Sequence, residues 1–263
     1  MANYNSGPVL SPAEVLDFTG DNGMGLYGME TTQRFNYGTR CLTEDGRVFY
    51  YAKSSGACYT GRMNTFDVAI DDTGLDWVSP AAATVVGARQ ITLTESGTAA
   101  IAEDALVNGF AMINYDAGSD NNDLMVRRIT GNTACASAGT TILDLDGPLD
   151  IALTVATSKI FAMASPWSSV KLSGGYLGSH CGVAAAYVAA TGYFHWEQTW
   201  GPCWITDWAA TLGHVNDSRQ LVVNNAGQMA PHDAATVMQH AGFIMDNNET
   251  DNGMSLVCLQ IMI

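Results

Sequence analysis

Short runs of strand-forming residues, separated by turn residues at close intervals, constrain this chain more than any other sequence feature. In the middle of the chain Gly, Asn and Asp clusters separate runs at residues 83–88, 90–94, 109–115, 124–130, 141–145 and 159–163. No helical periodicity of about ten residues recurs between the runs, so a parallel βαβ sheet is disfavoured. The pattern predicts a mainly β fold, an antiparallel barrel or sandwich with few short helices.

The first strand pair is predicted near the N-terminus. An Asp-Gly pair at residues 45–46 separates strand formers at 41–43 from strand formers at 47–52, and this arrangement is a strong hairpin signal. The second strand is apolar on both faces, because Tyr50 and Tyr51 point to opposite sides of it. We therefore expect this hairpin to be covered on both sides.

The C-terminal part contains the most aromatic segment of the chain. Residues 193–200 alternate so that Trp196 and Trp200 share one face of a predicted strand. The following Gly201-Pro202 is expected to form a sharp corner. Aromatic bulk of this kind fits packing between sheets or subunits, and a sugar-stacking platform is the alternative. Further strands are predicted at residues 221–223, 242–245 and 256–263.

The order of these signals predicts three regions. Residues 1–37 are expected to form an extended N-terminal arm with a short helix at 11–18, because Ser11-Pro12 is a good helix start. Residues 38–170 are expected to form a β domain. Residues 171–263 are expected to form a C-terminal β region, packed on that domain or continuous with it.

The charge balance argues against several classes of partner. The chain has 11 basic and 26 acidic residues and a formal net charge of −15. Nucleic-acid and anionic-membrane binding are therefore disfavoured, since both need clustered basic residues. No stretch approaches the roughly 20 apolar residues of a membrane-spanning helix. The first ten residues have neither a basic nor an apolar signal region, so no signal peptide is expected.

The cysteines and histidines do not form a recognisable site. The six cysteines lie far apart with no Cys-x-x-Cys pair, so buried free thiols are expected rather than zinc ligands or disulfides. The five histidines show no metal-binding spacing, and no metal or other cofactor is expected. A nucleophile at Cys181 with His214 and Asp217 can be drawn, but no spacing in the sequence supports it.

Two acidic turns are candidate calcium-binding segments. Residues 116–123 and 246–253 are rich in Asp and Asn, whose oxygens could bind calcium. Neither segment fits an EF-hand loop. Solvated turns are the simpler interpretation, because Asp and Asn side chains bond their own backbone.

Several segments together resemble the virion proteins that tailed bacteriophages encode near the major capsid protein. Gly38-Thr39-Arg40 leads into residues 43–52, which resemble the N-terminal hairpin of that group. Residues 192–202 are similar to its most recognisable strand. Further similar segments lie at 147–149, 165–170 and 182–184, so the resemblance extends from about residue 38 to residue 245. His195 and Glu197, inside the aromatic strand, depart from the pattern.

The resemblance implies a non-enzymatic capsid decoration, or cement, protein on the outer surface of the virion, made in the host cytoplasm. Its expected partners are further copies of itself, as a homotrimer, and the major capsid protein. The residues expected at capsid or subunit contacts are Arg34, Arg40, Arg47, Tyr50, Tyr51, Trp196 and Trp200. A glycan-binding adhesin on a tail or fibre is the alternative function. A hydrolase that uses Cys181 is a further alternative.

Overall fold

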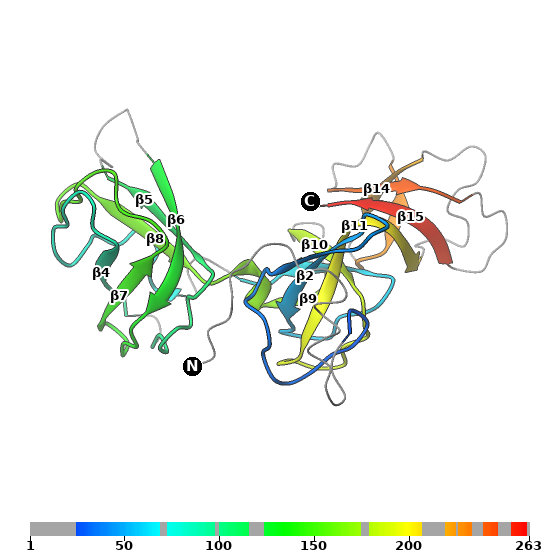
Figure 1. Cartoon of the computed structure of the whole chain (residues 1–263), viewed down its shortest axis with the longest axis horizontal. Coiled ribbons are helices and arrows are strands. Elements are labelled where there is room, and N and C mark those ends of the chain that lie inside the picture. The colour runs from blue at the N-terminus through cyan, green and yellow to red at the C-terminus, as the bar shows by residue number, and fades with distance from the viewer. Residues whose placement is uncertain are drawn as a thin grey trace. The chain divides into compact units, whose positions relative to one another are not determined.

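The computed structural model of the chain describes residues 25–68, 73–97, 100–115, 124–174, 179–206, 219–224, 226–232, 239–246 and 254–261. Nearly all regular structure in these ranges is β-strand, and the helical segments are short 3-10 turns such as η2 (Pro166–Ser168). The chain forms two compact units (Figure 1). Unit 1 comprises Met1–Asp67 and Trp167–Ile263, and unit 2 comprises Val68–Pro166.

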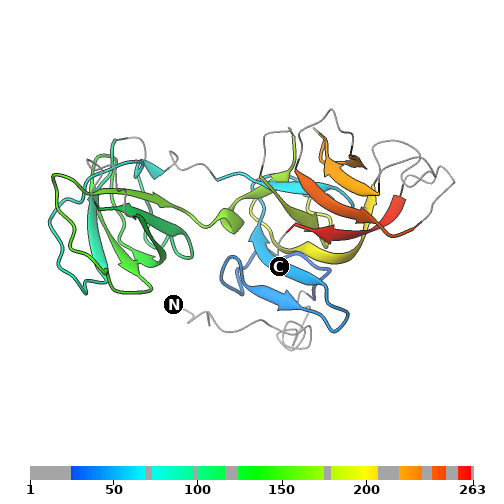
Figure 2. The same ribbon diagram turned by 90° about the horizontal axis from the view of Figure 1, so that it is seen from above.

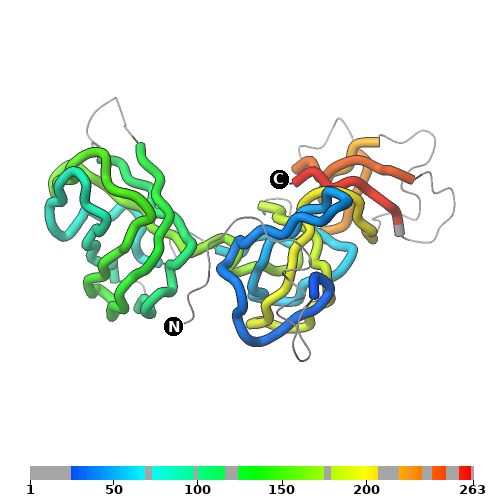
Figure 3. The backbone as a smooth tube through the Cα atoms, in the orientation of Figure 1, coloured from blue at the N-terminus to red at the C-terminus, as the bar shows by residue number. Residues whose placement is uncertain are grey.

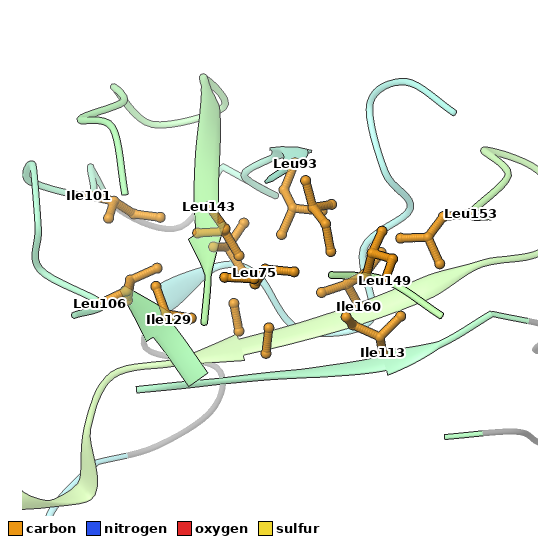
Figure 4. Packing of buried hydrophobic residues seen from close by; sticks show 14 residues of the cluster. Leu75, Leu93, Ile101, Leu106, Ile113, Ile129, Leu143, Leu149, Leu153 and Ile160 are labelled. Carbon is orange, nitrogen blue, oxygen red and sulfur yellow. The ribbon is translucent and has the colours of Figure 1, made fainter. Parts of the chain in front are cut away.

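Unit 2 is a curled antiparallel sheet in the order β4-β7-β6-β5-β8. Its strands are β4 (Gln90–Thr94), β5 (Phe110–Asn114), β6 (Leu124–Asn132), β7 (Thr140–Leu145) and β8 (Lys159–Met163). Alternate side chains of each strand point into the curl, as Ala111 and Ile113 of β5 do. They meet Leu75, Ile129 and Ile160 in a buried aliphatic core (Figure 4).

Unit 1 is built on a larger antiparallel sheet with the main path β13-β12-β14-β15-β11-β10-β3-β9. Its strands are β1 (Arg40–Leu42), β2 (Val48–Lys53), β3 (Met63–Phe66), β9 (Val170–Leu172), β10 (His180–Ala184), β11 (Phe194–Thr206), β12 (Gln220–Val223), β13 (Met229–Pro231), β14 (His240–Ile244) and β15 (Met254–Gln260).

The long strand β11 holds this sheet together (Figure 2). Its first half pairs with β2 on one side and with β10 on the other, and its second half pairs with β15. Among the named strands, the β1–β2 hairpin pairs with the rest of the sheet through β2 and β11. Segments from both ends of unit 1 therefore meet at β11.

The predicted mainly β, antiparallel fold is confirmed. The Asp-Gly hairpin is present as β1 and β2, and Gly46 adopts the left-handed conformation at its turn, with φ +83°. The runs predicted at residues 90–94, 109–115, 124–130, 141–145 and 159–163 coincide with β4 to β8. Turn chemistry and apolar alternation were therefore sufficient to locate most strands.

Two local expectations are wrong. Residues 83–88 form no strand; Thr84 makes one isolated bridge to Leu153, and the neighbouring valines stay exposed. Gly201-Pro202 forms no corner, because β11 continues through it to Thr206. Gly201 has φ +87°, and the β2 pairing ends with a register shift just before it. Pro202 is tolerated because the pairing of β11 with β2 has ended before it, so its missing N–H breaks no bond of that pair.

Strand pairing, rather than order along the chain, decides which residues belong to each unit. The region expected as one β domain at residues 38–170 is divided: its first part, up to Asp67, belongs to unit 1, and Val68–Pro166 forms unit 2. The reason is that β2 and β3 pair with strands that follow residue 166. Unit 2 is thus an insertion between β3 and β9. The helix predicted at residues 11–18 lies outside the described residues.

The close approach of β10 and β11 gives a stability prediction. A Cβ atom at Gly182 would lie 2.6 Å from the carbonyl oxygen of Gln198, so Gly182→Ala must push the two strands apart. We expect it to lower the free energy of unfolding by about 1–3 kcal/mol in urea denaturation. The control is Gly174→Ala, where nothing lies within 4 Å of the added carbon. Equal stability of the two variants would contradict the described packing.

Candidate functional site

The aromatic face of β11 belongs to the core of unit 1. Trp196 lies opposite Tyr51 across the β11–β2 pair, with ring centroids 5.2 Å apart, and both side chains are fully buried. Phe35, from the N-terminal segment, packs against both rings. Burial also raises the pKa of the Tyr51 hydroxyl. Tyr51 and Trp196 therefore pack within the fold and present no surface to a partner subunit.

The other two predicted aromatic contact residues are partly exposed. Tyr50 stacks on Trp167, with ring centroids 4.8 Å apart and an interplanar angle of 4°. Trp200 lies where the β2 pairing of β11 ends. A sugar-stacking platform needs exposed ring faces. Because Trp196 has none, the ring faces that β11 offers to such a ligand are those of Trp200, which is partly exposed, and Trp204, which is 58% exposed.

The three candidate arginines lie on the N-terminal segment and the first hairpin. Arg34 forms an ion pair with Glu30, and Arg47 forms one with Asp45 at 2.8 Å. Arg40 begins β1 and is partly exposed. Partly exposed pairs of this kind contribute little to stability, so these side chains can exchange partners at small cost. Their contact with an acidic capsid surface stays a prediction.

The opposite face of β11 carries the buried polar side chains of His195 and Glu197. Their spacing of two places both on the same face, away from Trp196. His195 Nε2 lies 2.7 Å from Glu197 Oε1, and neither side chain is exposed. Asn64 of β3 donates from Nδ2 to both carboxylate oxygens, at 2.8 and 3.1 Å. Such partners offset the cost of removing a carboxylate from water.

A cysteine from another part of unit 1 completes this group. Cys58, in the connection between β2 and β3, is fully buried, and its Sγ lies within 4.8 Å of donor atoms of His195 and Glu197. Burial raises the pKa of the Cys58 thiol, and the Glu197 carboxylate raises it further. The thiol is therefore protonated at neutral pH unless a cation is bound. We call Cys58, Asn64, His195 and Glu197 the buried polar cluster.

Of the three residues of the possible nucleophilic site, Cys181 lies in the described part of the chain. Cys181 of β10 is fully buried, and burial raises its pKa well above the ordinary value, with smaller contributions from Glu197 and Cys58. It presents no thiolate to solvent. His214 and Asp217 lie outside the described residues, as do the acidic turn at 116–123 and residues 247–253 of the second turn.

The exposed face of unit 2 is apolar along three neighbouring strands. Register places Val126, Met112 and Phe161 side by side across β6, β5 and β8, and Trp77 packs against Phe161 with ring centroids 5.0 Å apart. Leu124 is 72% exposed and Val126 57%. We call this surface the outer face; its apolar residues are Trp77, Phe110, Met112, Leu124, Val126, Phe161 and Met163.

Two open depressions also lie on unit 2. One, of about 410 Å³, adjoins the outer face at β6 and includes Arg127 and Asp150. The other, of about 690 Å³, lies beside β4 and includes Gln90 and Asp144. The described residues that line them include neither cysteine nor histidine. Neither depression therefore combines a thiol or imidazole with its carboxylate.

Comparison with protein-family models, curated proteins and solved structures finds no match to this chain. Among the residues that the structure describes, no helix is both long enough and apolar enough to cross a membrane. What the protein does must therefore be inferred from its own surface and its own buried groups.

Neither the buried polar cluster nor the outer face is predicted from the sequence. His195 and Glu197 were visible on one face of a predicted strand, but Cys58 and Asn64 reach them only through tertiary structure, from more than 130 positions away. The outer face had a sequence signal. Residues 110–113 read Phe-Ala-Met-Ile, which is apolar on both faces of a strand, and such a strand is buried on one side and needs a partner on the other.

The burial of the thiols predicts which cysteines react in the folded protein. Cys58 and Cys181 are expected to resist a thiol reagent at mildly alkaline pH, because both are buried and have raised pKa values. Cys135 and Cys258 are partly exposed and should be modified first. Mass spectrometry after brief labelling identifies the sites, with the unfolded chain as the fully labelled control. Rapid labelling of Cys58 or Cys181 without unfolding would contradict the structure.

Proposed function

We propose that this protein is a non-enzymatic virion structural protein that decorates and stabilises a phage capsid as a homo-oligomer, a homotrimer in its simplest form. The sequence resemblance suggests the class of virion protein. The observation that carries the proposal is the outer face of unit 2. Contiguous apolar surface that stays exposed in a single chain is typical of a protein–protein contact.

The charges around the outer face favour a second copy of the chain as its occupant. Register places Arg128 beside Phe110 and Lys159 beside Asn114, so the charged residues paired into this face are basic. The chain as a whole carries a formal charge of −15, so its copies repel one another unless a contact brings basic against acidic surface. An apolar centre with basic neighbours is complementary to such an acidic surface.

The symmetry of a trimer is consistent with this arrangement. A ring of three copies needs a contact between two different surfaces, repeated until the ring closes. The outer face of one copy would meet an acidic surface of the next. In this proposal the arginines of the N-terminal segment, Arg34, Arg40 and Arg47, remain available for the capsid shell.

The position of the reactive groups supports a structural role over catalysis. The thiols of Cys58 and Cys181 and the His195–Glu197 pair all lie in the interior of unit 1. A nucleophile or general base must come within hydrogen-bond reach of its substrate. Groups buried in this way lie out of reach of a substrate, whereas the accessible apolar residues of unit 2 are suited to association.

The proposed contact is tested by the mass of the protein in solution. We expect the wild-type chain at micromolar concentration to have three times the mass of one chain by light scattering. Val126→Asp should weaken this association on the order of a hundredfold, because it places an unpaired carboxylate in an apolar contact.

The matched control is Val86→Asp, at an exposed valine of unit 2 outside the outer face. It should leave the mass unchanged. A monomeric wild-type chain, or equal dissociation of both variants, would refute the role of the outer face.

A further inference from the structure

Charge balance among the side chains does not by itself explain why these residues come together in the buried polar cluster. Three different donor types, a thiol, an imidazole and a carboxylate, converge with their atoms within 4.8 Å of one another, and all three side chains are fully buried. The core packed against a β-sheet normally excludes such groups, because each costs free energy to remove from water. A bound ligand would account for their convergence.

We propose that Cys58, His195 and Glu197 bind a structural Zn²⁺ ion inside unit 1. Zinc takes sulfur, nitrogen and oxygen ligands of these kinds, whereas calcium and magnesium take oxygen ligands alone. This inference does not depend on the proposed capsid role, since it concerns the stability of unit 1.

The charges of the cluster balance when zinc is bound. Coordination removes the Cys58 proton, so one thiolate and one carboxylate together neutralise the two positive charges of the ion. The imidazole binds as a neutral ligand. The site then carries no net charge among fully buried side chains, which is the arrangement that a buried ion requires.

The distances allow zinc to enter with small shifts. Bonds of about 2.0–2.3 Å to a tetrahedral ion hold its ligand atoms roughly 3.3–3.7 Å apart. The His195 Nε2 to Glu197 Oε1 distance of 2.7 Å would lengthen by under about 1 Å, and the Cys58 sulfur would move inward within the cluster. A water molecule would take the fourth position.

Neighbouring groups support the same assignment. Asn64 donates to both oxygens of Glu197 and would orient this carboxylate as an outer partner of the ion. Two buried polar atoms, Nδ1 of His195 and Oδ1 of Asn64, have no hydrogen-bond partner among the described residues. Buried polar atoms left unpaired in this way are typical of a site that holds a further water or ion.

The first test measures metal in the purified full-length chain. Protein made in zinc-supplemented medium should retain about one Zn²⁺ per chain after dialysis, by elemental analysis. Removal of the ion with a chelator should lower the unfolding temperature, and Zn²⁺ alone should restore it. After replacement by Co²⁺, a thiolate-to-metal absorption band should appear. A chain that retains no zinc and whose unfolding temperature ignores both zinc and chelator overturns the proposal.

The second test assigns the ligand. Cys58→Ser should lose the bound zinc, whereas Cys203→Ser, at another buried thiol of unit 1, should retain it. If Cys58→Ser fails to fold, the cobalt band of the wild-type chain still decides whether a cysteine is a ligand. Retention of zinc by Cys58→Ser, or its loss from both variants, would show that the cluster is not the site.

Discussion

Unit 1 depends on one constraint: the first half of β11 is buried on both of its faces. One face carries Trp196 against Tyr51, and the other carries His195 and Glu197 against Asn64. A strand of this kind must be covered by neighbours that come from elsewhere in the chain. Phe35 of the N-terminal segment packs on the aromatic face, and Cys58 and Asn64 lie against the polar face, so both covers come from the chain segment before residue 67. The division of unit 1 into two chain segments follows from this requirement.

The two units hold different kinds of chemistry. Unit 1 contains the polar and sulfur-bearing side chains of the cluster in its interior. The backbone of its two chain segments can be followed in Figure 3. Unit 2 has an aliphatic interior and leaves apolar side chains such as Leu124 and Val126 on its surface. Each of these two features suggests a binding event. A metal ion suits the first feature, and a protein surface suits the second.

The sequence was enough to predict the class of fold and most strands, because turn residues and alternation act locally. The Asp-Gly turn before Val48 and the alternation at residues 141–145 are examples. It was not enough to predict the units, because pairing of Tyr51 with Trp196 is a property of the tertiary fold. For the same reason, the sequence did not distinguish aromatic residues that pack inside the fold from those at its surface. Tyr51 and Trp196 had the composition of an interface, and the fold places them in its own core.

Electron cryo-microscopy of the assembled virion tests the central claim most directly. We expect density for this chain on the capsid exterior, arranged in threes, with the outer face of unit 2 covered by the neighbouring copy. Density at the tail tip or inside the head would contradict the capsid role. Density on the capsid in which Leu124 and Val126 face solvent would contradict the contact on which the proposal is based.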